Sequence, residues 1–84
     1  MTFTSLDHIE EGHRIIERLK SEGLDELAEG IFRAIRYSFS GLELVYSLLN
    51  SLESAKESGS IKNDHTVLKI DNLIVDLKKK VNIV

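Results

Sequence analysis

Glu10 and His13 are the residues whose types and spacing come closest to a metal-binding or catalytic motif. They form Glu-x-x-His, which places a carboxylate and an imidazole on one helical face, as in the di-iron sites of helical bundles. Such a site needs a second copy of the motif and carboxylates from two more helices. The helices predicted further along the chain carry Leu, Ile and Val on their inner faces instead. The pattern therefore favours a histidine at the rim of the core, and we expect no metal and no cofactor.

The other two histidines, His8 and His65, each follow an aspartate near the start of a predicted helix. Surface or capping positions are sufficient to explain both residues. A serine hydrolase would need Ser, His and Asp side chains that converge in a pocket with an oxyanion hole. A helical chain of 84 residues has little room for such a pocket. We therefore expect no enzymatic activity, and a metal-binding helical bundle built on the Glu-x-x-His pair is kept as a second alternative.

Length and composition indicate one small helical domain that spans residues 1–84. The chain has 84 residues, of which 42% are hydrophobic and 30% charged, so it has the composition of a globular protein with a single core. Proline is absent, and apolar residues recur at intervals of three and four, which is typical of amphipathic helices. This periodicity predicts four helices, at about residues 5–22, 24–37, 41–57 and 64–82. The expected fold class is all-α, a small four-helix bundle-like domain.

Within that fold we expect a three-helix core and a C-terminal helix that packs on it or is shared in a dimer. The predicted helix at 41–57 is the central one, because its apolar side chains cover an arc of about 200° at about 100° per residue. The residues at the middle of this arc should be nearly inaccessible to water. They are Val45, Leu48, Leu49 and Leu52.

Glycine and serine residues mark the expected ends of the helices. Gly23 suits the left-handed conformation that ends a helix. Ser40 opens a Ser-Gly-Leu-Glu capping box, with Ser38 as the alternative cap. Gly12 and Gly30 lie inside predicted helices, where each costs about 1 kcal/mol relative to alanine. Close approach of the first two helices and simple tolerance on an exposed face explain these two glycines equally well.

The predicted C-terminal helix has an apolar face too wide for one neighbour. Its main stripe repeats at alternating intervals of three and four, and further apolar residues on both sides widen the face to about 220°. A core of this size usually needs a disulfide, a metal or self-association, and the chain contains no cysteine. We therefore predict a homodimer in which this helix contributes the interface. The predicted interface residues are Leu68, Ile70, Leu73, Ile74, Val75 and Leu77.

Charge and hydropathy make several partners improbable. The net charge of −3 offers no long-range attraction to a phosphate backbone, so we expect no nucleic-acid binding. The run Lys78-Lys79-Lys80 suits the negative end of a helix dipole and needs no nucleic acid. No apolar run is long enough to cross a bilayer, so we expect no membrane partner. The lack of cysteine is compatible with a reducing compartment and points to the cytoplasm.

These observations predict a non-enzymatic protein that binds other proteins, namely a small accessory or regulatory protein of bacterial type that acts as a homodimer. The first alternative is a toxin-neutralising immunity protein or antitoxin, a class that is often small and acidic. That alternative depends only on the size and charge of the chain.

Overall fold

The computed structural model describes residues 5–38 and 41–81, which form an all-α four-helix bundle, so the predicted fold class is confirmed. The helices are α1 (Ser5–Ser21), α2 (Asp25–Arg36), α3 (Gly41–Glu57) and α4 (Asp64–Val81). Each end differs by at most one residue from the range expected from the sequence, which is within the usual disagreement over helix ends.

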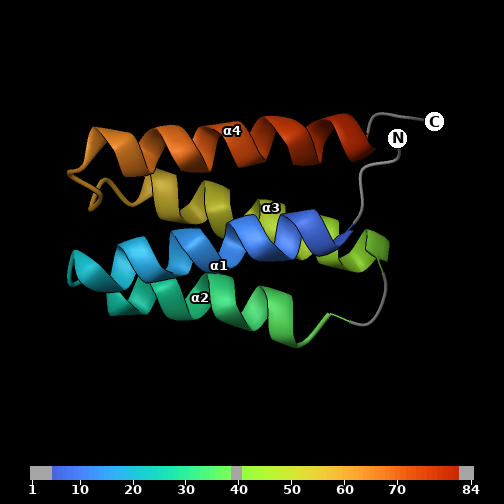
Figure 1. The fold of residues 1–84 in the computed structure, drawn as a ribbon, viewed down its shortest axis with the longest axis horizontal. Helices are drawn as coiled ribbons and strands as arrows, with labels where there is room; N and C mark the ends of the chain where they lie inside the picture. Colours follow the sequence, from blue (N-terminus) through green and yellow to red (C-terminus); the bar gives the residue numbers. More distant parts are fainter. Residues whose placement is uncertain (1–4, 39–40, 82–84) are drawn as a thin grey trace.

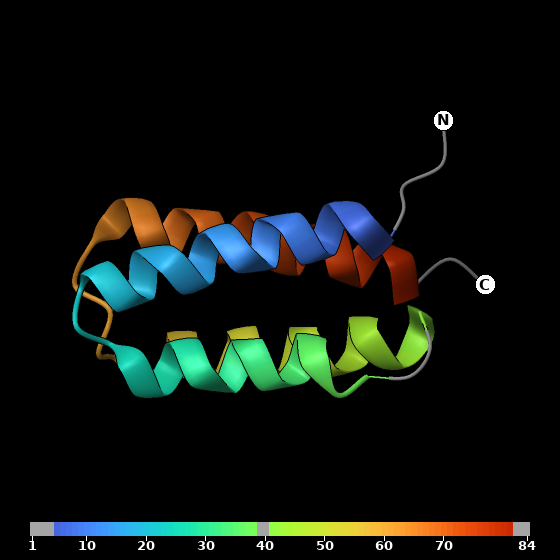
Figure 2. The same ribbon diagram turned by 60° about the horizontal axis from the view of Figure 1, so that its bottom comes forward.

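The four helices run up and down along the long axis of the molecule (Figure 1). Helices α1 and α4 form one layer and α2 and α3 the other (Figure 2). Helix α1 packs against α2 and α4, and α3 packs against the same two helices. A smaller contact joins α1 to α3 across the bundle. Helix α4 therefore has two neighbours and is a full member of the bundle rather than an addition to a three-helix core.

All four helices contribute side chains to one hydrophobic core. The inner residues of α3 are buried as predicted: Val45, Leu48, Leu49 and Leu52. The largest hydrophobic side chains that are fully buried come from every helix: Ile15, Leu19, Ile31, Leu48, Leu52, Ile70 and Leu77. Burial of such side chains is the main stabilising term in a domain of this size.

The turn between α1 and α2 confirms the role predicted for Gly23, which has a φ of 79°. The backbone N–H of Leu24 donates to the carbonyl of Leu19 at 2.8 Å, and that of Gly23 donates to the carbonyl of Lys20 at 3.1 Å. This pair of hydrogen bonds is the Schellman motif, which satisfies the last carbonyls of a helix. Leu24 also packs against the core, so the turn holds α1 and α2 close together.

Polar side chains near the starts of α3 and α4 make hydrogen bonds that the sequence did not predict. The side-chain oxygen of Asn63 accepts a hydrogen bond from the backbone N–H of His65 at 2.9 Å, so Asn63 caps α4. The hydroxyl of Ser38 donates to the carbonyl of Ala34 at 2.5 Å and is therefore bound to α2. The cap predicted at Ser40 lies outside the described residues.

The two glycines inside helices have different explanations. A Cβ atom at Gly12 would lie 2.8 Å from Cδ1 of Ile35 on α2 and 3.8 Å from Cδ1 of Leu48 on α3. Gly12 therefore lies where the helices pack closely, and any side chain there would make Ile35 shift. A Cβ atom at Gly30 would meet nothing within 4 Å, so this glycine is tolerated on an exposed face.

Candidate interaction surface on helix α4

The structure divides the six predicted interface residues into two groups. Ile70, Leu73, Ile74 and Leu77 are buried within the chain's own bundle, in contact with the rest of the core. They are covered because α4 lies beside both α1 and α3, whereas a single neighbour was assumed in the prediction. These four residues hold α4 in place. Of the six, Leu68 and Val75 therefore remain able to contact a partner.

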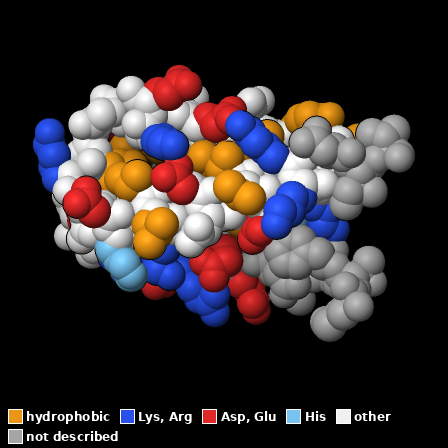
Figure 3. Space-filling view, turned by 90° about the horizontal axis from the view of Figure 1, so that it is seen from above, with side chains coloured by type: hydrophobic (Ala, Val, Ile, Leu, Met, Phe, Trp, Pro, Cys, Tyr) orange, Lys and Arg blue, Asp and Glu red, His pale blue; other side chains and the backbone are white. Residues whose placement is uncertain are grey.

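Leu68 and Val75 remain exposed, with 53% and 52% of their surfaces accessible. They are seven residues apart, so at about 100° per residue they lie almost directly above one another on the helix. The same geometry places them opposite the buried side of α4, facing solvent. Figure 3 shows the molecule from the α4 side, where hydrophobic side chains reach the surface among charges of both signs.

Polar residues continue the line of these two side chains along α4. The six residues that share this side fall within an arc of about 100° and extend about 22 Å along the helix. We call them the outer stripe: Asp64, Leu68, Asp71, Asn72, Val75 and Lys79. All six are exposed except Asp71, which is half-buried.

Two ion pairs fix the edge of the outer stripe that lies beside α3. Lys56 Nζ lies 2.6 Å from Asp71 Oδ1, and Lys78 Nζ lies 3.2 Å from Glu53 Oε2. Pairs as exposed as these contribute between 0 and about 1 kcal/mol each. They tie α3 to the edge of the outer stripe, because Asp71 belongs to the stripe and Lys78 lies beside it.

A buried threonine anchors the N-terminal end of α4 to α1. Arg18 Nε donates a hydrogen bond to Thr66 Oγ1 at 3.0 Å, and the Thr66 hydroxyl donates to Glu22 Oε2. This cluster was not predicted from the sequence. Its only signal was a threonine four residues before Ile70, on the line of the buried residues of α4.

Replacing Thr66 with valine, which has nearly the same shape, should lower the free energy of unfolding by about 1–2 kcal/mol. The change leaves the part-buried side chains of Arg18 and Glu22 without this partner. Urea denaturation of Thr66→Val, of Glu22→Ala and of the double variant measures the coupling between the two residues. Strictly additive losses would show that the hydrogen bond contributes nothing to stability.

The structure corrects the position predicted for one histidine. His8 was expected at the surface or as a cap, but its side chain is fully buried in α1. His13 and Glu10 are both exposed, and the ring of His13 contacts Phe32 edge-on with 6.5 Å between the ring centroids. No group of three or more His, Cys, Asp or Glu side chains able to hold a metal ion occurs within residues 5–38 and 41–81.

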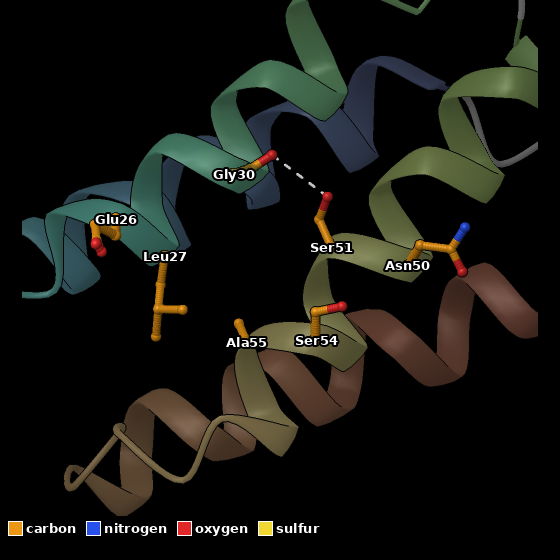
Figure 4. A pocket seen from close by; sticks show the side chains of 7 residues that line it. All are labelled: Glu26, Leu27, Gly30, Asn50, Ser51, Ser54 and Ala55. Atoms are coloured by element: carbon orange, nitrogen blue, oxygen red, sulfur yellow. Dashed lines mark hydrogen bonds between the residues drawn. The ribbon is translucent and has the colours of Figure 1, made fainter.

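A depression of about 260 Å³ lies between α2 and α3 (Figure 4). The hydroxyl of Ser51 donates to the carbonyl of Gly30 across it at 3.3 Å. Small or polar side chains make most of its wall: Glu26, Leu27, Gly30, Asn50, Ser51, Ser54 and Ala55. This lining contains one carboxylate and no histidine, cysteine or lysine, so it offers neither an acid–base pair nor an activated nucleophile.

The comparisons with known proteins identify no relative. The chain matches no protein-family model, no curated protein and no solved structure at a significant level. In the part of the chain that the structure describes, no helix is long and apolar enough to cross a membrane.

A second group of exposed apolar residues lies where α2 ends and α3 begins. Tyr37, Leu42 and Tyr46 are each at least half exposed. The guanidinium carbon of Arg36 lies 5.9 Å from the ring centroids of both Phe32 and Tyr37, a cation–π geometry. The guanidinium of Arg36 therefore contacts aromatic rings at the end of its own helix. This group contains no two aliphatic side chains seven residues apart on one helix, as Leu68 and Val75 are.

Proposed function

We propose that this chain is a non-enzymatic protein-binding protein that acts as a homodimer in the cytoplasm, with the outer stripe of α4 as its contact surface. The observation that carries the proposal is the alignment of two half-exposed aliphatic side chains, Leu68 and Val75, on the solvent side of one helix. Scattered exposed hydrophobic residues are normal on monomeric proteins. A pair spaced by seven residues lies on one line of the helix, so both side chains can contact the same partner helix.

The size of the domain supports self-association. A chain of 84 residues has a small core and is only marginally stable, and it has no cysteine with which to form a disulfide. Binding a second folded copy stabilises the folded state by mass action. The lack of cysteine also suits the reducing conditions of the cytoplasm.

The proposal predicts a dimer that Val75→Glu disrupts. Sedimentation equilibrium of the parent chain across micromolar concentrations should give a concentration-dependent mass that approaches twice that of the monomer. Val75→Glu should weaken this association about tenfold or more, because it places a carboxylate in an apolar contact on both copies. Helical content by circular dichroism should stay unchanged, since Val75 is not part of the core.

Asn50→Glu is the matched control, because it adds the same carboxylate at an exposed position of α3 away from the stripe. This variant should associate as the parent does. A parent chain that stays monomeric at every concentration would rule out the homodimer. A Val75→Glu variant that dimerises as well as the parent would place the interface elsewhere on the molecule.

A further inference from the structure

We infer that two copies of α4 pair in antiparallel orientation, the outer stripe of one against the outer stripe of the other. This inference rests on the proposed self-association through α4 and adds the orientation of the partner. The stripe is symmetric about the midpoint between Asp71 and Asn72. Leu68 and Val75 are equally far from that midpoint, and so are the two charged residues at the ends, Asp64 and Lys79.

Antiparallel pairing about this midpoint matches every position with a complementary one. Asp64 faces the partner's Lys79, and Leu68 faces the partner's Val75. At the centre, Asp71 faces the partner's Asn72, whose amide N–H groups can donate to the carboxylate. Because the contact is two-fold symmetric, each of these pairs occurs twice. The dimer then has an ion pair at each end and four aliphatic side chains between them.

Parallel pairing would bring identical residues together and is opposed by charge. The carboxylates of Asp64 would face each other, as would the ammonium groups of Lys79. Like charges placed opposite one another are destabilising and exclude wrong pairings. The helix dipoles also favour the antiparallel arrangement, because it places the positive N-terminus of one helix beside the negative C-terminus of the other.

The flanks of α4 are compatible with this pairing. The two-fold axis brings the α3 side of one copy beside the α3 side of the other. That side carries both signs of charge, since Lys56 is paired with Asp71 and Lys78 with Glu53. The α1 side also carries both signs, from residues that line a surface hollow there: Glu11, Lys69 and Asp76. Among the described residues, each flank therefore carries charges of both signs.

The inferred contact is small, so the dimer should be weak and sensitive to salt. Two aliphatic side chains per copy place it among the smaller protein interfaces. Screening by salt weakens the exposed end pairs. Lys79→Asp should weaken association about tenfold, because it sets two carboxylates against each other at both ends. Adding Asp64→Lys to that variant restores opposite charges in the antiparallel pairing and should recover the parent affinity.

Disulfide cross-linking tests the orientation directly, because the chain has no cysteine of its own. Leu68→Cys and Val75→Cys are prepared separately, mixed and oxidised under mild conditions. Both positions are exposed, so neither change disturbs the core. In the antiparallel dimer the two different cysteines meet. Identical cysteines lie about 10.5 Å apart along the helices, beyond the Cα separation of about 7 Å that a disulfide tolerates.

We expect the mixture to give a mixed disulfide far faster than either variant gives a self-disulfide. Glu26→Cys on α2, mixed with Val75→Cys, measures the rate of random collision. Self-disulfides that form faster than the mixed one would establish parallel pairing and overturn the orientation, while self-association through α4 would stand. Rates equal to the collision control in every mixture would overturn the α4 contact itself. Sedimentation of the unsubstituted chain then decides separately whether the protein forms a homodimer at all.

Discussion

Leu48→Ala is expected to lower the free energy of unfolding by about 2–5 kcal/mol, because it leaves a cavity at a fully buried position. Leu48 lies on α3 and belongs to the core that all four helices share. Folded domains have only about 0.05–0.15 kcal/mol of stability per residue, so such a loss is a large share of the total for 84 residues. The variant should therefore unfold at a much lower urea concentration than the parent, as circular dichroism and urea titration will measure.

Leu42→Ala is the matched control for Leu48→Ala. It makes the same change in the same helix, but Leu42 is 61% exposed and packs little against the rest of the bundle. Its effect should stay within about 0.5 kcal/mol. Both variants should be measured at the lowest practical concentration, so that self-association does not add to the apparent stability. Equal losses from the two changes would contradict the assignment of Leu48 to the core.

The helices were predictable because their signals are local. Hydrophobic spacing depends only on the period of the helix, and the residues it selects on α3, such as Leu48 and Leu52, are the ones that the structure buries. The end of α1 was equally predictable, since Gly23 adopts the positive φ that a Schellman turn requires.

The packing partners of α4 were not predictable in the same way. An apolar arc shows how much of a helix avoids water, but it does not show how many neighbours provide the cover. Because α4 closes the bundle between α1 and α3, Ile70 and Leu77 are buried within the chain itself and need no second chain to cover them. Of the six predicted interface residues, Leu68 and Val75 were left exposed, and distinguishing them from the other four required the arrangement of the helices.

Polar residues inside the bundle were missed for a related reason. Thr66 bonds to Arg18 and Glu22, which are more than 40 residues away in the sequence, so no local pattern connects them. His8 was placed at the surface because it follows an aspartate near a helix start, and a histidine in such a position is compatible with either environment. Tertiary contacts decided both positions.

Gly12→Val is expected to lower the free energy of unfolding by about 1–3 kcal/mol through overpacking. A Cβ atom at this position already lies 2.8 Å from Cδ1 of Ile35, and the branches of valine would approach it further. Gly30→Ala should have the opposite sign and raise stability by about 0.5–1 kcal/mol, because it removes the flexibility of a glycine without meeting any neighbour. Thermal and urea unfolding will measure both changes.

The double variant Gly12→Val, Ile35→Ala distinguishes steric conflict from a loss of helix propensity. Shortening Ile35 removes the atom that the new side chain meets, so the double variant should be less destabilised than the sum of the two single changes. Valine forms helices better than glycine, so propensity alone would make Gly12→Val stabilising. The sign of the single change therefore reports which effect is larger. If Gly12→Val is as stable as Gly30→Ala, then the Ile35 side chain or the two helices shift at little cost, and close packing at Gly12 does not hold α1 and α2 in register.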